Sequence, residues 1–345
     1  MSPIAKPKFK NPRARYNFQG RSVSVVGVGA YVPAKALTNF ELEKLVSTTD
    51  EWITSRTGIK ERRIAAKDEF TSDLGAKAAQ RAMKNAGVTA DQIDLIIVAT
   101  ITPDMVFPST ACLVQQKIGA LRAAAFDLEA ACSGFIYGLE IGQQFIMSRT
   151  YDTVLVIGAE KLSSIVDWQD RNTCVLFGDG AGAVVLQNRA NSHGLLTAVM
   201  GADGGKAELL HMPGGGSRCP ATAQSVAARL HYLRMEGKET FKHAVQAMVN
   251  AATEALRRCD VDITKIKCII PHQANRRIID AVGDRLGARP GQLFVNLDRY
   301  GNTSAASVAI ALDEAVSSGR IHRGDLILLV VFGAGLTWGA AVIEW

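Results

Sequence analysis

The order of helical and strand-like patterns repeats once along the chain, and this repeat restricts the fold more than any other feature. In the first half, helical patterns at 72–87, 109–119 and 132–148 alternate with apolar strand patterns at 94–100, 123–129, 151–160 and 178–187. The second half has the same order. Its helical patterns are at 241–259, after the PHQAN stretch as far as 287, and at 303–318, and its strand patterns are at 267–271, 292–298, 324–335 and 336–345. Nearly continuous apolar strands that alternate with helices are typical of sheets covered on both faces. The repeat therefore predicts a duplicated α/β unit, with two sheets and helices around and between them.

The C-terminal segment Leu326–Ile343 is almost wholly apolar and close to the length of a membrane-spanning helix. However, Gly333, Gly335 and Gly339 interrupt it, and β-branched residues are concentrated at its ends. The segment also matches the last two strand patterns of the first half. It therefore predicts two neighbouring buried strands and no membrane span.

Composition and charge exclude several classes of protein. The 345 residues are 48% apolar and 21% charged, which is typical of a soluble globular chain. The net charge is +6, aromatic residues make up 6%, and no basic stripe interleaves with them, so a nucleic-acid partner is not indicated. The six cysteines show no CxxC spacing, which predicts neither a metal site nor a disulfide framework and favours reduced thiols in the cytoplasm.

The chain divides into three parts on this reading. Residues 1–20 contain lysines and arginines but no acidic residue and no apolar run, which does not fit a secretory signal and predicts a poorly ordered basic arm. We expect an N-terminal half at 21–190 and a C-terminal half at 191–345. The seam between the two halves is the natural place for a functional site.

The stretch FDLEAACSGF places Cys132 between a predicted strand and a predicted helix. The N-terminus of a helix carries about half a unit of positive charge, and a thiol at such a position has a stabilised thiolate. The small residues Ala130, Ala131 and Gly134 leave room for a substrate. A buried structural cysteine is the alternative, because most free cysteines are of that kind.

Two residues of the second half lie at similar corners. His272, in PHQAN, follows a predicted strand at its carboxyl end, where α/β sheets form ligand crevices. Asn302, in RYGNTSAAS, lies at another strand-to-helix corner, and the repeat aligns it approximately with Cys132. Taken singly, a structural histidine and a helix-capping asparagine are the ordinary interpretations. A cysteine with a distant histidine and asparagine is also a known pattern of nucleophilic catalysis.

Together, the segments DLEAACSGF, PHQAN, YGNTSAAS and FGAGLTWGAA resemble those of β-ketoacyl-(acyl-carrier-protein) synthase III. The resemblance extends from Val23 to Trp345 and includes TTDEWITSRTGIKERR (48–63), FPSTACLVQ (107–115), FGDGAGA (177–183) and MEGKETFK (235–242). It implies the thiolase fold, a five-layer αβαβα sandwich built from two similar halves. It also implies a condensing enzyme that initiates type II fatty-acid synthesis, in which an acyl-CoA starter, acetyl-CoA or a similar short chain, reacts with malonyl-acyl-carrier-protein. The products would be 3-oxoacyl-acyl-carrier-protein, CoA and CO2.

The resemblance implies a role for each candidate catalytic residue. Cys132 attacks the thioester and carries the acyl group. His272 and Asn302 donate hydrogen bonds to the enolate that forms when the malonyl group loses CO2. The backbone N–H groups of Cys132 and Ala334 hold the oxyanion of the tetrahedral intermediate.

The resemblance implies binding residues as well. Coenzyme A contacts are expected at Thr48, Trp52, Arg56, Arg171, Gly237, Phe241, Ala274, Asn275 and Phe332. Contacts with the acyl-carrier protein are expected at Lys242, Gln273, Arg276, Arg277 and Arg285. Phe107 is expected to reach the acyl pocket of a partner subunit, which implies a homodimer. Acyl-CoA is a substrate, and neither a cofactor nor a metal is implied.

Three alternatives were compared with this reading. The first is a synthase of the same fold that is specific for the starter of a polyketide or a signal molecule; Leu336, where an aromatic can occur, leaves the length of the starter open. The second is a catalytically silent subunit, which the complete Cys–His–Asn set disfavours. The third is a dinucleotide-binding dehydrogenase, suggested by GVGAYVP (27–33), but this stretch lacks the GxGxxG spacing and the acidic residue about twenty positions further on.

Overall fold

The computed structural model describes residues 22–189 and 194–345. The predicted basic arm at 1–20 and the predicted boundary between the halves at 190–191 lie outside the described residues.

The first sheet has five strands in the order β1, β7, β6, β4, β5. Their bounds are β1 (Val23–Tyr31), β4 (Leu95–Ala99), β5 (Ala124–Leu128), β6 (Thr153–Glu160) and β7 (Gly180–Asn188). β4 is parallel to β5 and β6, whereas β7 is antiparallel to β6 and β1. Every residue of β4 and β6 is buried, which agrees with their nearly continuous apolar sequences.

The second sheet repeats this arrangement in the order β8, β13, β12, β11. Its strands are β8 (Leu195–Ala202), β11 (Ile266–Pro271), β12 (Leu326–Gly333) and β13 (Thr337–Glu344). β11 and β12 are parallel, and β13 is antiparallel to both β12 and β8. β8 therefore holds the place that β1 has in the first sheet. The sequence patterns did not include these two opening strands.

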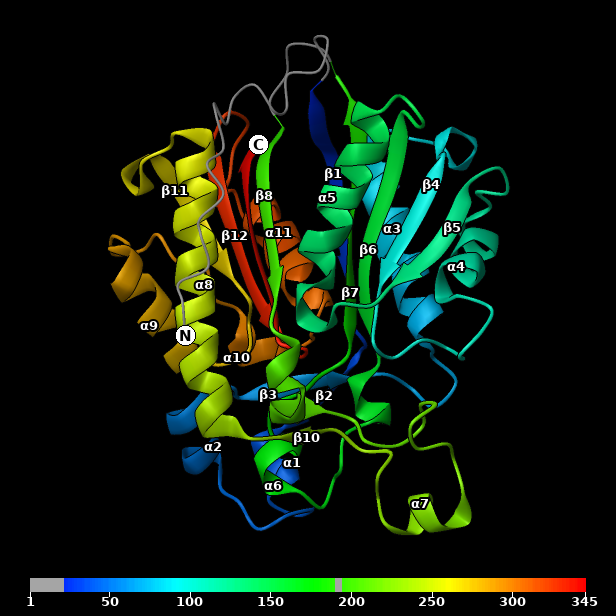
Figure 1. Cartoon of the computed structure of the whole chain (residues 1–345), viewed down its shortest axis with the longest axis vertical. Helices are drawn as coiled ribbons and strands as arrows, with labels where there is room; N and C mark the ends of the chain where they lie inside the picture. The colour runs from blue at the N-terminus through cyan, green and yellow to red at the C-terminus, as the bar shows by residue number, and fades with distance from the viewer. Residues whose placement is uncertain (1–21, 190–193) are drawn as a thin grey trace.

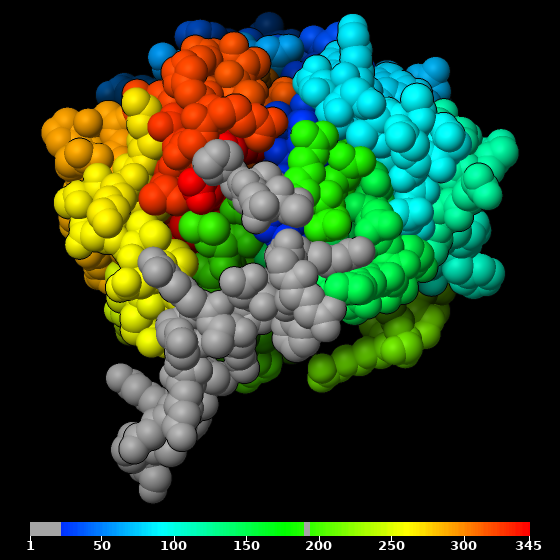
Figure 2. Space-filling view, turned by 90° about the horizontal axis from the view of Figure 1, so that it is seen from above, coloured from blue at the N-terminus to red at the C-terminus, as the bar shows by residue number. Residues whose placement is uncertain are grey.

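Helices cover and separate the two sheets (Figure 1). The outer face of the first sheet carries α3 (Thr71–Ala86) and α4 (Thr110–Ile118), and the outer face of the second carries α8 (Gly237–Cys259) and α9 (Arg276–Leu286). Between the sheets lie α5 (Gly134–Met147) and α11 (Ala306–Ser317), which contact each other and strands of both sheets. The five layers are therefore α, β, α, β, α. Seen from one end, the cyan and green first half lies beside the yellow and orange second half (Figure 2).

Glycines in the first sheet let α11 pack closely against it. A Cβ atom on Gly158 of β6 would lie 2.3 Å from the carbonyl oxygen of Ala305, and one on Gly182 of β7 would lie 2.5 Å from Cβ of Ala309. Because no side chain larger than hydrogen fits at these positions, the start of α11 lies directly on the sheet. This contact places the loop before α11 close to the end of β6.

The apolar C-terminus forms two strands, as the sequence predicts. β12 and β13 pair with Leu326 opposite Glu344 and Gly333 opposite Thr337. Within residues 22–189 and 194–345, no helix is long and apolar enough to cross a membrane.

The predicted strand at 292–298 is wrong. Only one isolated parallel bridge forms there, between Leu293 and Ile269 of β11, and Leu297–Tyr300 is a short helix, α10. The backbone N–H of Asn296 donates to the side chain of Gln273 at 2.9 Å, not to β11. This side-chain contact ends the ladder after a single bridge.

Short elements gather at the lower end of the molecule as drawn in Figure 1. They are β2 (Lys35–Thr38), α1 (Asn39–Leu42), α2 (Asp50–Thr57), β3 (Glu61–Ile64), α6 (Arg171–Cys174), β9 (Leu210–His211), α7 (Ala223–Ala227) and β10 (Arg234–Met235). Leu42, Ile53 and Phe177 belong to a separate apolar cluster in this region. This cluster holds the segments that border the cavities described below.

Candidate active site

Cys132 lies in a single 3₁₀ turn, Ala131–Ser133, that connects β5 to α5. The residue is only 7% exposed, but it borders two cavities and is therefore not sealed inside the core. Ala131 has a φ of +47°, a left-handed conformation that L-residues rarely adopt. Such strain is often found at functional sites, where the surrounding structure maintains it.

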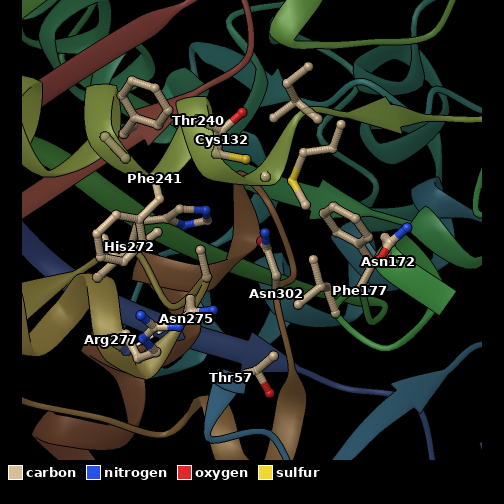
Figure 3. Close-up of a pocket in the computed structure, with 18 of the residues that line it drawn as sticks. Thr57, Cys132, Asn172, Phe177, Thr240, Phe241, His272, Asn275, Arg277 and Asn302 are labelled. Carbon is tan, nitrogen blue, oxygen red and sulfur yellow. Dashed lines mark hydrogen bonds between the residues drawn. The ribbon is translucent and has the colours of Figure 1, made fainter. Parts of the chain in front are cut away.

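His272 and Asn302 border the first cavity together with Cys132 (Figure 3). This cavity has a volume of about 680 Å³. His272 follows the end of β11, and Asn302 lies in the loop between α10 and α11, so the three side chains come from three separate corners. The structure thus brings together the three residues that the sequence nominated.

The His272 ring is held by a residue that sequence reasoning missed. Its Nδ1 lies 2.6 Å from Oγ of Ser307, the first-turn residue of α11, and that oxygen also accepts the backbone N–H of Gln273 at 3.4 Å. The Ser307 proton is then free for Nδ1, which favours a hydrogen on Nε2. Burial lowers the pKa of His272 to about 4, so the ring is neutral at pH 7. The segment YGNTSAAS contains Ser307, but nothing in the sequence indicates that this serine contacts His272.

Asn302 does not cap α11, whose N-cap residue is Ala305. The Oδ1 atom of Asn302 accepts a hydrogen bond from the backbone N–H of Ser304 at 2.9 Å. This bond fixes the orientation of the amide, and the NH2 group is left to donate into the cavity. The backbone of Asn302 bonds to Leu176 and Gly178, which ties the loop to the segment before β7.

The expected lowering of the Cys132 pKa is not found. Burial raises the pKa of the thiol to about 12, and this outweighs a nearby hydroxyl, that of Ser304, which lowers it. α5 begins only at Gly134, with Ser133 as its N-cap residue, so the sulfur lies just outside the helix end. The thiol is therefore protonated at neutral pH and needs a proton acceptor when it reacts.

The turn between β12 and β13 lies against the nucleophile. A Cβ atom on Gly333 would lie 2.7 Å from the backbone nitrogen of Cys132. Ala334, the next residue, borders the second cavity together with Cys132. Thr337 Oγ1 lies 3.0 Å from the carbonyl oxygens of both Ala130 and Ala334 and so connects the two corners. The backbone of Ala334 is thus held beside Cys132, where the sequence expects a donor to an oxyanion.

The second cavity has a volume of about 490 Å³ and meets the first at Cys132. Much of its wall is apolar, with Ile101, Leu162, Ile165 and Leu233 among its residues. A linear ligand in the first cavity would thus bring its reacting group to the sulfur and direct the remainder into the second.

Most of the expected coenzyme A residues border the first cavity. They are Trp52, Arg56, Gly237, Phe241, Ala274, Asn275 and Phe332. Thr48 and Arg171 are not on its wall, but Arg171 lies over the Trp52 ring, with its guanidinium carbon 4.6 Å from the centroid. Arg56 contacts the same ring at 4.8 Å. At these distances no aromatic base fits between ring and guanidinium, so a bound adenine would require Arg171 to move.

The expected carrier-protein residues lie mostly on the surface near the mouth of this cavity. Lys242, Arg276, Arg277 and Arg285 are exposed. Gln273 is wrong for this role, because it is 1% exposed and its amide is engaged by the backbone of Pro271, Phe294 and Asn296. Phe107 is 82% exposed. Among the residues that the structure describes, no three histidine, cysteine or acidic side chains converge as metal ligands.

Comparisons with known proteins agree with this geometry. Two family models match: 3-oxoacyl-[acyl-carrier-protein (ACP)] synthase III over residues 126–204 and its C-terminal counterpart over residues 256–345. A β-ketoacyl-[acyl-carrier-protein] synthase III of Caldanaerobacter subterraneus subsp. tengcongensis is 56% identical over 324 residues, which are 94% of this chain and 98% of the relative.

Solved structures give the same result. The 3-oxoacyl-[acyl-carrier-protein] synthase III of Aquifex aeolicus is 49% identical, with a TM-score of 0.87 over 94% of this chain and 100% of that one. A priming β-ketosynthase of a polyketide pathway is 37% identical, with a TM-score of 0.87 over 98% of each chain.

The layered fold and the cysteine at the seam of the two halves define a condensing enzyme of the thiolase fold. At 56% identity over nearly its whole length, the chain belongs to the β-ketoacyl-[acyl-carrier-protein] synthase III family. The predicted fold and family are confirmed.

Proposed function

We propose that this protein condenses an acyl-CoA with malonyl-acyl-carrier-protein, with loss of CO2, and so initiates fatty-acid synthesis through an acyl-Cys132 intermediate. One observation carries the proposal: Cys132 lies where two cavities meet, and His272 and Asn302 border one of them beside it. This arrangement gives a covalent nucleophile access to a long thioester on one side and space for its acyl group on the other.

Acylation is the first of two steps. The sulfur of Cys132 attacks the thioester carbonyl, the bond between that carbon and the sulfur of CoA breaks, and CoA leaves. The backbone N–H groups of Cys132 and Ala334 donate to the oxyanion of the tetrahedral intermediate. The acyl chain extends into the second cavity, and the emptied first cavity can receive the malonyl group.

Condensation is the second step. The malonyl carboxylate leaves as CO2, and its electron pair forms an enolate whose oxygen accepts hydrogen bonds from His272 and Asn302. Both donors are neutral at pH 7, because burial holds the pKa of His272 at about 4. They therefore stabilise the new charge without giving up a proton that would quench it. The enolate carbon then attacks the acyl group, and the sulfur of Cys132 leaves.

A reconstituted reaction tests this function. We expect the purified protein, an acyl-CoA and malonyl-acyl-carrier-protein to yield 3-oxoacyl-acyl-carrier-protein, with CoA and CO2 released in equal amounts. Mass spectrometry of the carrier protein and a thiol assay of CoA measure the two products. Release of CoA without a 3-oxoacyl product would contradict the proposal, because it would indicate thioester hydrolysis.

A starter-specific synthase of polyketide or signal biosynthesis is the second candidate, and the likeness to the priming β-ketosynthase favours keeping it. Both candidates use the same chemistry. A panel of acetyl-, branched and longer acyl-CoA substrates separates them by the starter that acylates fastest.

Three partner and location assignments belong to the same proposal. The exposed residues Lys242, Arg276, Arg277 and Arg285 form a basic surface suited to an acidic carrier protein. The exposed Phe107 and Val106 suit burial against a second copy of the chain, with Phe107 near its acyl cavity. The free cysteines suit a reducing cytoplasm.

Trp52 is expected to contribute to the binding of the nucleotide end of acyl-CoA. Replacement of Trp52 by alanine should raise KM for acyl-CoA by roughly 10-fold, because a stacking contact is typically worth about 1–2 kcal/mol. The value of kcat should change little, since the ring is expected to contact the nucleotide and not the thioester. Steady-state kinetics with acyl-CoA measures both constants. The matched control is an acyl thioester of N-acetylcysteamine, which has no nucleotide; an equal rise of KM for both donors would contradict a nucleotide contact.

A further inference from the structure

Glu160 is a buried carboxyl group with no role in the reaction described so far. It ends β6 and is fully buried. Its Oε2 accepts the hydroxyl groups of Thr100 at 3.1 Å and Thr102 at 2.7 Å and the backbone N–H of Ile101 at 3.1 Å. The two threonine oxygens themselves accept backbone N–H groups, of Thr102 and Lys161, so their own protons are committed to Glu160.

The other carboxyl oxygen of Glu160 is nearly unoccupied. Oε1 has only a long contact, 3.3 Å, with the N–H of Ile101, which Oε2 already accepts at a shorter distance. Oε1 therefore retains a lone pair that can take up a proton.

Ser304 lies between Glu160 and the nucleophile. The next residue, Ala305, packs against Gly158, which is two residues before Glu160 on the same face of β6. Ser304 also borders the second cavity together with Cys132. The Ser304 hydroxyl lowers the pKa of the Cys132 thiol and that of the Glu160 carboxyl. In the described structure the same hydroxyl is buried and makes no well-formed hydrogen bond, so neither its proton nor its lone pairs are committed. Ser304 has a φ of +47°, the same unusual conformation as Ala131 across the cavity that both border. The fold thus holds an uncommitted hydroxyl beside the sulfur.

We propose that Glu160, acting through the hydroxyl of Ser304, holds the proton of the Cys132 thiol while the sulfur carries the acyl group. This inference rests on the proposed function. During acylation the thiol proton passes to Ser304 Oγ as the Ser304 proton passes to Glu160. The S–C bond to the acyl group forms, the thioester bond to CoA breaks, and CoA leaves as a thiolate that takes a proton from solvent.

The relay runs in reverse during condensation. As the enolate carbon attacks, the bond between Cys132 and the acyl carbon breaks, and Glu160 returns the proton to the sulfur through Ser304. Decarboxylation supplies the electron pair for the new C–C bond. Over one cycle a single proton enters from solvent, to CoA, and the enzyme regains its starting state.

Other groups near the sulfur are less suited to this role. The thiol needs an acceptor because burial raises its pKa to about 12. His272 holds its Nδ1 against Ser307, and burial lowers its pKa to about 4, so it is a weak base. Burial raises the pKa of Glu160 to about 7, which suits a group that must both accept and return a proton near neutral pH.

Among the described residues, four further charged side chains lie on the segments around this pair. Glu129 and Asp127 border the second cavity, and Glu129 raises the pKa of the thiol further. Asp179 precedes Gly180, the strand partner of Glu160, and its carboxylate accepts from Ser163. Lys161 turns its ammonium towards backbone carbonyl oxygens on the segment before α3. Burial raises the pKa of the Glu160 carboxyl to about 7, so its charge changes near neutral pH.

The Glu160→Gln variant tests the relay, with single-turnover acylation followed by intact-protein mass spectrometry from about pH 5.5 to about pH 9. The wild-type rate should fall as pH drops below about 7, because Glu160 becomes protonated and cannot accept a second proton. The variant should acylate roughly 10²-fold more slowly and lose this fall. Decarboxylation of malonyl-acyl-carrier-protein, measured in a Cys132→Ala background, should be the same with and without Glu160→Gln.

Two further variants make the test decisive. Ser304→Ala should show the same slow, pH-independent acylation, and it carries the test if thermal melting shows that Glu160→Gln does not fold. Glu160→Asp keeps a carboxylate. It should restore part of the acylation rate, and this rate should again decrease at acidic pH. If folded Glu160→Gln and Ser304→Ala variants still acylate more slowly below about pH 7, the proposed proton transfer through Ser304 is overturned, whatever their absolute rates. A wild-type protein that is acylated by no acyl-CoA would overturn the proposed function itself.

Discussion

Replacement of Cys132 by alanine is expected to abolish the acyl-enzyme and to lower the condensation rate by roughly 10⁶-fold, the scale seen when a covalent nucleophile is removed. The methyl group cannot form a thioester, and the hydrogen-bond donors around it cannot replace the lost covalent step. Intact-protein mass spectrometry after mixing with an acyl-CoA measures the effect. The wild type should gain the mass of one acyl group, and the variant should gain none.

Cys112 provides the matched control for this experiment. Its thiol is exposed, whereas Cys132 is buried, so non-specific acylation would favour Cys112. The Cys112→Ala variant should gain the same mass as the wild type at the same rate. An acyl group that remains on the Cys132→Ala protein would show that the nucleophile has been assigned wrongly.

The Asn302→Ala variant is expected to separate the two steps of the reaction. Loss of one oxyanion donor should slow decarboxylation of malonyl-acyl-carrier-protein roughly 10²–10³-fold, the usual cost of removing such a donor. Acylation should stay within a few-fold of the wild type, because Asn302 donates to the enolate and not to the first tetrahedral oxyanion. Release of CO2 from the malonyl substrate measures the loss.

The acylation assay on the same preparation serves as the internal control, because it shows that the Asn302→Ala protein is folded and binds acyl-CoA. His272→Ala should behave in the same way, since its Nε2 faces the same oxygen. Decarboxylation at the wild-type rate in either variant would refute the assigned role. Equal losses in both steps would point to a disturbed loop.

The sequence predicted much of this architecture because its signals are local. Buried strands such as β4 and β6 are apolar throughout, and Gly333 and Gly335 mark the turn that ends β12. The corner that holds Cys132 was visible because small residues separate a strand pattern from a helix pattern. The family motifs then linked this corner with His272 and Asn302.

What the sequence did not predict depends on contacts between distant segments. The prediction of a strand at 292–298 was wrong because the backbone N–H of Asn296 donates to the side chain of Gln273 and not to a neighbouring strand. The same contact buries Gln273 and removes it from the surface expected for the carrier protein. The pKa of Cys132 rises because both halves close around the sulfur, which no local pattern records. Glu160 and Ser307 were missed for this reason too.

The corner that bears Cys132 leads into α5, the corner that bears Asn302 leads into α11, and both residues border the first cavity. In a site built between two identical chains, the two corners would necessarily carry the same side chain. Because both corners belong to one polypeptide, their sequences can differ, and the site holds a sulfur at one corner and an amide at the other.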